Sequence, residues 1–187
     1  MAYPFIASPH VTRTTGRAVD IVVVHTMEAP ERADTAEAVA RWFARADSRV
    51  SAHYCVDADS IVQCVHEDDI AWHARGGNER SIGIELAGYA GQGPRGWDDD
   101  YSWSVLERSA ILTAEICRRH DIPARRLRAP DLRMRRRGVT GHADVSEAFR
   151  RTDHWDPGPA FPWRRFLRLV RMRLALGGDV VERSTQA

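Results

Sequence analysis

Continuous apolar runs mark two places along the chain where a buried strand is expected. The first covers residues 18–25 and is rich in β-branched side chains, and the second covers residues 81–86. Runs that are apolar at nearly every position, instead of at every second one, predict strands covered on both faces. A single charged residue, Glu85, interrupts the second run. Burying a carboxylate without a partner is costly, so Glu85 calls for a specific role.

Two further segments, residues 51–56 and 61–65, predict the strands of a hairpin around a polar turn. A two-residue loop at Asp59-Ser60 would place Cys55 directly opposite Cys64. The chain has three cysteines, an odd number without metal-binding spacing, which argues against a disulfide framework. We therefore expect this pair to be close but unbonded.

Helical periodicity predicts three helices. Residues 35–46 place apolar side chains on one face, with Asp34 as the expected N-cap. Residues 102–120 follow three aspartates and end in two arginines and a histidine, charges that complement a helix dipole. Residues 161–176 carry the third apolar face. A short helical turn is also expected at residues 67–71.

The composition fits one folded domain. The chain has 187 residues, of which 43% are apolar, enough for one sizeable core. Residues 1–17 are expected to form an arm over the surface, residues 18–176 the folded domain, and residues 177–187 a disordered tail. Because the sequence has no apolar stretch long enough for a membrane span and no visible secretory signal, we expect synthesis in the cytoplasm without membrane insertion.

All basic residues are arginines, 27 in number, and the formal net charge is only +1. The overall field therefore does not indicate nucleic acid or a membrane as a partner. Seven arginines nevertheless crowd residues 125–137. For this segment we favour a solvated basic loop over a dedicated site for an anionic polymer. Because lysine is missing, any step that an ammonium group performs in a related enzyme needs another side chain here.

Three residues far apart in the sequence have the character of a metal site. His142 lies in a Gly-His-Ala-Asp segment, Asp156 in a His-Trp-Asp-Pro-Gly-Pro segment, and His25 at the end of the first apolar run. A catalytic zinc site typically has three protein ligands of these types and leaves the fourth position to water. Each residue also has a simpler interpretation. His25 could be a histidine at the end of a strand, His142 a loop residue and Asp156 a turn residue. Spacing alone leaves both readings open.

Six segments resemble, in chain order, the signature of the type 2 N-acetylmuramoyl-L-alanine amidases. They are the segments around His25-Thr26, Ser51-Ala52-His53-Tyr54, Ala71-Trp72-His73-Ala74, residues 81–86, Gly141-His142-Ala143-Asp144 and Asp156-Pro157-Gly158-Pro159. The resemblance implies a single α/β domain with a central mixed β-sheet flanked by helices, with residues 18–176 as a zinc amidase catalytic domain. The implied reaction is hydrolysis of the amide between the muramic acid lactyl group and L-alanine of the stem peptide.

The resemblance also implies roles in the chemistry. The residues expected to bind one zinc ion are His25, His142 and Asp156. As proton acceptor, family members use either a tyrosine just before the hairpin histidine or a glutamate in the second buried strand. Because Ala52 stands at the first place, we expect Glu85 to be the general base and proton shuttle. The alternative for Glu85 is a structural pair with an arginine.

Departures from the family pattern concern the rest of the site. Many relatives have a lysine two residues before the final ligand, where this chain has His154. We expect His154 to stabilise the oxyanion, although it could instead compete for the metal. Trp72 and His73 are expected to contact substrate, with core packing an equal alternative for Trp72. The usual glycine after this motif is Arg75 here, and the long spacing before the final ligand predicts a loop at residues 146–151 beside the groove.

The implied function is zinc-dependent cleavage of wall peptidoglycan, as by a phage or prophage endolysin. We expect a monomer that is synthesised in the cytoplasm without a signal peptide and acts on the bacterial cell wall. Two alternatives are a cytosolic muropeptide-recycling amidase and a non-catalytic peptidoglycan-binding module. Such modules commonly lose a zinc ligand, whereas this chain keeps all three together with Glu85. The expected partner in every case is peptidoglycan or a muropeptide.

Overall fold

The computed structural model describes residues 3–184, and from residue 177 on it describes the backbone alone. A five-stranded sheet forms its centre, in the order β4-β3-β6-β2-β7. The strands are β2 (Ile21–Thr26), β3 (Tyr54–Val56), β4 (Ile61–Gln63), β6 (Ser81–Leu86) and β7 (Gly138–Gly141). β4 is antiparallel to β3, and the other neighbours are parallel. The predicted fold class, one α/β domain with a mixed sheet, is confirmed.

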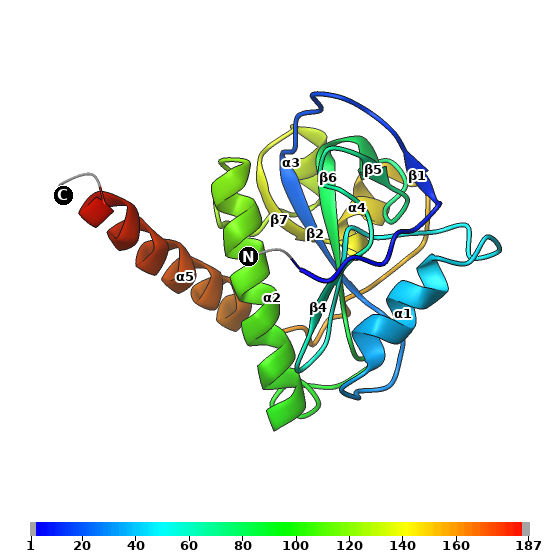
Figure 1. Ribbon diagram of the computed structural model, residues 1–187, viewed down its shortest axis with the longest axis horizontal. Helices are drawn as coiled ribbons and strands as arrows, with labels where there is room; N and C mark the ends of the chain where they lie inside the picture. Colours follow the sequence, from blue (N-terminus) through cyan, green and yellow to red (C-terminus); the bar gives the residue numbers. More distant parts are fainter. Residues whose placement is uncertain (1–2, 185–187) are drawn as a thin grey trace.

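The strand β2 sends alternate side chains to two opposite layers. Val22 and Val24 pack in the layer of α2 (Asp100–Arg119) and α5 (Trp163–Ser184). Figure 1 shows these two helices together on one side of the sheet and α1 (Thr35–Phe43) on the other. Ile21 and Val23 pack instead with side chains of α3 (Ala129–Arg133) and α4 (His142–Phe149). By the same alternation, His25 belongs to the second layer.

The helix α1 covers β3 and β4 through Ala36, Ala40 and Phe43, which pack with the side chains of the hairpin. Asp34 is the N-cap residue, as predicted, but its side chain makes no capping hydrogen bond. A carboxylate from the hairpin turn replaces it, because the backbone N–H of Ala36 donates to Asp57 Oδ2 at 2.8 Å. The first turn of this helix is thus tied to the sheet rather than to its own preceding residue.

The hairpin has a four-residue loop, since Val56 pairs with Ile61. Asp57 closes this loop by accepting hydrogen bonds from the backbone N–H groups of Asp59 and Ser60. Cys55 therefore opposes Val62, and the expected direct pairing of Cys55 with Cys64 is wrong. A shift of two residues keeps both cysteines on one face. Their sulfurs lie 3.9 Å apart as free thiols, so the expectation of a close, unbonded pair is confirmed.

The N-terminal arm extends the sheet edge. Ile6 N and Ser8 N donate to the carbonyls of Gln63 and Cys64, each at 2.9 Å. Further along, β1 (Val11–Thr12) pairs with β5 (Ile70–Ala71) as a small antiparallel sheet. The turn expected at residues 67–71 is present only in its first part, where Asp69 N donates to the carbonyl of His66 at 3.0 Å. The expectation is wrong at residues 70–71, because a segment some 60 residues earlier in the chain supplies a strand partner.

The helix α2 matches the predicted helix, and its N-cap is Asp99, whose carboxylate accepts from Ser102 N at 2.8 Å. The last helix differs from expectation. It continues through the two glycines to Ser184, so the tail expected to be disordered is helical at residues 177–184. Residues 185–187 lie outside the described residues. Within residues 3–184, no helix combines the length and the apolar character needed to cross a bilayer.

The arginine-rich segment is more ordered than a solvated loop. It contains α3, and two of its arginines, both partly buried, form specific contacts. Arg126 pairs with Asp144 and lies 3.7 Å from the ring centre of Trp163, while Arg137 Nε lies 3.3 Å from Asp20 Oδ1. The expectation of a solvated basic loop is therefore wrong at Arg126 and Arg137, where the guanidinium groups stabilise the packing of α4 and of the sheet.

Candidate active site

The three predicted metal ligands meet at one end of the sheet. His25 lies near the end of β2, His142 directly follows β7, and Asp156 lies in the loop before α5. Because β2 and β7 are parallel neighbours, their carboxyl ends deliver the two histidines to the same edge. One donor atom of each of the three residues lies within 4.8 Å of the others, and all three residues are buried.

The carboxylate of Asp156 bridges the two imidazoles. Its Oδ2 lies 2.9 Å from His25 Nδ1, and its Oδ1 lies 3.2 Å from His142 Nδ1. Burial raises the pKa of Asp156, but the hydrogen bonds and charges of His142 and His25 lower it far below its usual value. Burial also lowers the pKa of His142, which favours a neutral imidazole with a free lone pair. Two neutral imidazoles and one carboxylate are the donor set of a zinc site, so these residues could hold a divalent metal ion.

Glu85 lies beside this group, in register with His25 on the neighbouring strand β6. Burial raises its pKa well above the usual value, and the charges of Asp156 and Glu28 raise it further. Among the side chains that the structure describes, no arginine lies within ion-pair distance of Glu85. The alternative of a structural pair with an arginine therefore has no support in the contacts of this carboxyl.

His154 lies at the rim of the group. Its ring stacks on that of His142, with centres 4.3 Å apart, and its Nδ1 lies 3.6 Å from Asp156 Oδ1. More than half of the side chain is exposed, at 58%. Partial burial, followed by the nearby His142, lowers the pKa of His154 below its usual value. His154 is not one of the three residues whose donor atoms converge.

Trp72 and His73 both line the cavity above the three ligands. Trp72 is 40% exposed, and its Nε1 donates to Thr12 Oγ1 at 3.0 Å, so it is not packed in the core. His73 is oriented differently. Its Nδ1 lies 2.9 Å from His25 Nε2, and its Nε2 lies 3.0 Å from Ser81 Oγ. Of the two residues expected to contact substrate, His73 thus has both of its ring nitrogens engaged by the protein.

The cavity over the ligands has a volume of about 380 Å³, and a second one of about 520 Å³ adjoins it. The residues that line both are Val50, Trp72, His73, His142 and His154. The first cavity extends over α1 to Trp42 and Phe43, and the second extends to Arg49 and Arg75. We call the two together the active-site groove. One arm is mainly aromatic and apolar, and the other carries positive charge.

Sequence reasoning missed Trp42 and Glu28 as groove residues. Trp42 is an exposed aromatic residue on a helix whose other face is apolar. This exposure on the polar face was the one feature of the sequence that could have indicated a groove residue. The loop expected at residues 146–151 is helical as far as Phe149, where α4 ends. Only Thr152, just after that segment, reaches the groove, with Oγ1 3.5 Å from His142 Nε2.

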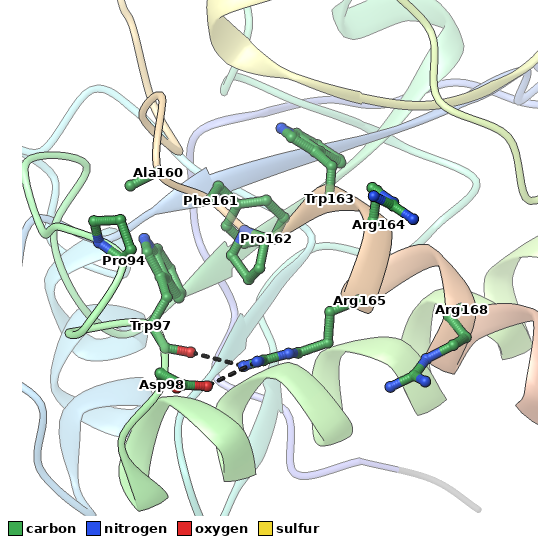
Figure 2. Close-up of a pocket in the computed structure, with 10 residues that line it drawn as sticks. All are labelled: Pro94, Trp97, Asp98, Ala160, Phe161, Pro162, Trp163, Arg164, Arg165 and Arg168. Atoms are coloured by element: carbon green, nitrogen blue, oxygen red, sulfur yellow. Dashed lines mark hydrogen bonds and ion pairs between the residues drawn. The ribbon is translucent and has the colours of Figure 1, made fainter.

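A separate cavity of about 720 Å³ lies between the start of α5 and the loop before α2 (Figure 2). It shares no lining residue with the active-site groove. As Figure 2 shows, Arg165 spans it, with Nη2 2.7 Å from Asp98 Oδ1 and Nη1 donating to the carbonyl of Trp97 at 3.4 Å. In the described part of the chain, the group of donors able to hold a metal lies in the groove and not here.

Comparison with known proteins places this geometry in a family. The family description "N-acetylmuramoyl-L-alanine amidase" matches residues 15–159. The chain belongs to the N-acetylmuramoyl-L-alanine amidase family. N-acetylmuramoyl-L-alanine amidase A of Achromobacter lyticus is 31% identical over 165 residues, which cover 84% of this chain and 86% of that protein. The AmpD 1,6-anhydro-N-acetylmuramyl-L-alanine amidase of Escherichia coli K12 is 36% identical over 131 residues, 65% of this chain and 59% of that protein.

Solved structures of other proteins have the same fold. The hydrolase AmiA of Staphylococcus aureus aligns with a TM-score of 0.73 at 17% identity, covering 96% of this chain and 86% of that one. The catalytic domain of XlyA aligns with a TM-score of 0.63 at 22% identity, covering 91% and 99%. The match to the family description and the identity to the Achromobacter lyticus amidase confirm the predicted family and the predicted enzyme class, N-acetylmuramoyl-L-alanine amidase.

Proposed function

We propose that this amidase is zinc-dependent and hydrolyses the amide between the lactyl group of N-acetylmuramic acid and L-alanine of peptidoglycan. The observation that carries the proposal is the convergence of His25, His142 and Asp156 beside the carboxyl of Glu85, in one groove. Residues 18–176 form the catalytic domain in this proposal, and it acts as a monomer on the bacterial cell wall.

The two imidazoles and the carboxylate would hold one zinc ion. When bound there, zinc supplies Lewis-acid polarisation of the scissile carbonyl and lowers the pKa of water. Asp156 contributes the negative charge, and both histidines contribute neutral nitrogen donors. The residues that remain must move protons and stabilise the charge that develops on the carbonyl oxygen.

We assign proton transfer to Glu85. Its carboxyl lies opposite His25 and has no cation to neutralise it among the described side chains. A raised pKa suits a group that first accepts a proton from water and then gives it to the leaving amine. The same carboxyl would serve both steps, because the departing nitrogen must be protonated before L-alanine leaves.

We assign oxyanion stabilisation to His154. It lies in the loop before α5, half exposed at the rim of the groove, where its free imidazole N–H can reach a bound carbonyl. The chain has no lysine, and an imidazole is another side chain that can donate a hydrogen bond to an oxyanion. The exposed face of Trp72 offers a surface on which a sugar ring can stack.

We propose wall peptidoglycan as the substrate, as for a phage or prophage endolysin. The open groove has two arms that meet at the ligands, which leaves room for a glycan on one side and a peptide on the other. A muropeptide-recycling role is the second candidate, because the chain is 36% identical to AmpD of Escherichia coli over 131 residues. Turnover of intact sacculi and of free anhydromuropeptide, compared at equal enzyme concentration, separates the two.

The central experiment is dye release from purified cell walls, with the zinc content of each protein measured. We expect His142→Ala to lose both zinc and activity. We expect Glu85→Gln to keep zinc and lose activity about 10²- to 10⁴-fold, the usual contribution of general acid–base catalysis. Glu147→Gln, an exposed change on α4, is the matched control. Full activity in Glu85→Gln would remove Glu85 from the mechanism, and a wild type that binds walls without releasing dye would identify a binding module.

A further inference from the structure

We propose that His73 is a positioning residue: when a metal ion binds His25 Nδ1, the imidazole of His73, supported by Ser81, accepts the proton of His25 Nε2 and fixes the orientation of that ring. This inference rests on the proposed metal centre. It replaces the role expected from the sequence, in which His73 contacts substrate. The evidence is a line of hydrogen bonds that starts at His25 and ends at a backbone carbonyl behind the groove.

The line runs along the floor of the groove. His25 Nε2 lies 2.9 Å from His73 Nδ1, and His73 Nε2 lies 3.0 Å from Ser81 Oγ. The hydroxyl of Ser81 in turn donates to the carbonyl of Asn78 at 3.5 Å. The two imidazole planes are nearly perpendicular, at 86°, and their centres lie 5.1 Å apart. Each ring nitrogen of His73 therefore has one partner.

The state of His25 Nδ1 sets the direction of the line. Asp156 Oδ2, at 2.9 Å, can only accept, so without a metal ion the proton of His25 lies on Nδ1 and its Nε2 accepts from His73 Nδ1. A metal ion bound to His25 Nδ1 would place the proton on Nε2 instead, and His73 Nδ1 would then accept it. His73 Nε2 would in turn donate to the hydroxyl of Ser81, which can donate to the carbonyl of Asn78.

Metal binding through His25 Nδ1 therefore needs an acceptor for the proton of Nε2. His73 Nδ1 lies at hydrogen-bond distance from Nε2, 2.9 Å away. Without this acceptor, the N–H of a metal-bound His25 would be left unpaired at a buried position. Fixing the other nitrogen of a ligating histidine is a general way to orient the ring and raise its basicity.

The backbone around His73 is shaped to hold its ring. A Cβ at Gly83 of β6 would lie 2.5 Å from His73 Cγ and Nδ1, so the imidazole rests directly on a strand position that lacks a side chain. Asn78 Oδ1 accepts from the backbone N–H groups of His73 and Ala74, at 3.3 Å and 2.6 Å. Both contacts fix the position of the ring without involving substrate.

The test measures zinc affinity, by competition with a chelator, in three variants. We expect His73→Leu, which removes the acceptor, to weaken zinc binding about 10- to 100-fold. In His73→Asn, the side-chain oxygen has the same connection to Cγ as the lost Nδ1, so most of the affinity should return. We expect Ser81→Ala, which removes one hydrogen bond at the far end, to weaken binding about 2- to 10-fold. His66→Leu, at an exposed ring stacked on Phe5, is the control.

Nitrogen NMR of the histidine rings supplies a second measurement, which a purely structural role would not change. We expect zinc to move the protons of His25 and of His73 from Nδ1 to Nε2 in the wild type, and the change at His73 to be incomplete in Ser81→Ala. Wild-type affinity in His73→Leu, or an Asn variant as weak as the Leu variant, overturns the inference. If the Leu variant does not fold, an Asn variant that binds zinc no better than Ser81→Ala overturns it. A wild type that binds no zinc refutes the proposed function instead.

Discussion

His25 and Glu85 are paired in register on the two central parallel strands, at the edge of the sheet where the proposed metal ligands converge. A partly buried carboxyl thus lies beside a histidine, and the described side chains provide no arginine to neutralise it. Such an arrangement costs stability unless a cation binds, which is typical of residues that are retained for chemistry.

Replacing this carboxyl should therefore stabilise the metal-free protein. A carboxyl whose pKa is raised on folding stabilises the protein most below its unfolded pKa, and this contribution is lost as pH rises above that value. Glutamine does not titrate. We expect zinc-free Glu85→Gln to match the wild type near pH 4 and to melt at a higher temperature at pH 7. Thermal unfolding with a chelator present measures this, and equal melting temperatures at both pH values would contradict the raised pKa.

Glu67 gives the opposite pH dependence. Burial raises its pKa, but hydrogen bonds from Arg119, His120 and Tyr54 outweigh this effect and lower the pKa to about 2. A lowered pKa contributes stability above the unfolded pKa, and this is lost as pH falls through the folded one. We expect Glu67→Gln to lose about 3 kcal/mol of unfolding free energy at pH 7.

Urea unfolding at several pH values tests this prediction. The difference between wild type and Glu67→Gln should shrink as the pH falls below about 4.5, the usual glutamate value, and be small near pH 2. Glu79→Gln, at an exposed position in the turn before β6, should differ little from the wild type at any pH. If the difference in unfolding free energy did not change with pH, the lost stability would come from altered packing and not from the lost charge.

Gly83 should not tolerate a side chain. Its Cβ would lie 2.5 Å from the ring of His73, so Gly83→Ala must displace that ring or the strand. We expect a loss of about 1–3 kcal/mol in stability, the usual cost of overpacking, together with weaker zinc binding. Gly93→Ala, where nothing lies within 4 Å of the added atom, is the control. Unchanged zinc affinity in Gly83→Ala would show that the ring position is not critical.

Arg126 should be needed for folding stability. It pairs with Asp144, whose side chain is only 8% exposed, and lies over the ring of Trp163. We expect Arg126→Ala to cost about 3 kcal/mol, since it leaves a buried carboxylate short of its partner. Arg128 Nη1, at 3.9 Å from the other carboxylate oxygen, keeps the loss near the lower end of the usual range. Denaturant unfolding should show almost no loss in Arg133→Ala, an exposed neighbour.

The sequence predicted the parts of the fold whose signal is local. The apolar runs predicted β2 and β6, and the acidic start and basic end of α2 agreed with its helical period. The convergence of His25, His142 and Asp156 was foreseen from family motifs, which encode spatial proximity that spacing alone does not. Glu85 was found by a physical signal, a charge within an apolar strand.

The parts that failed depend on partners far along the chain. The strand β5 exists because β1 pairs with it, and the hairpin register follows from hydrogen bonds to the side chain of Asp57. Glycine lowers helix propensity by only about 1 kcal/mol, so the pair at residues 177–178 does not end α5. The direction of the His73 ring depends on Ser81 and on the bare Gly83, and neither reveals this in the sequence.

The alternation of side chains along β2 decides which residues face the groove and which face the apolar interior. Val22 and Val24 fill the layer of α2, and His25 points the other way, toward Asp156. Deleting any one residue between positions 21 and 24 would exchange these faces, because a strand repeats every two residues. An imidazole would then enter the layer of α2, and an aliphatic side chain would take its place beside the carboxylate. The strand can tolerate many substitutions, but it cannot tolerate the deletion of a single residue.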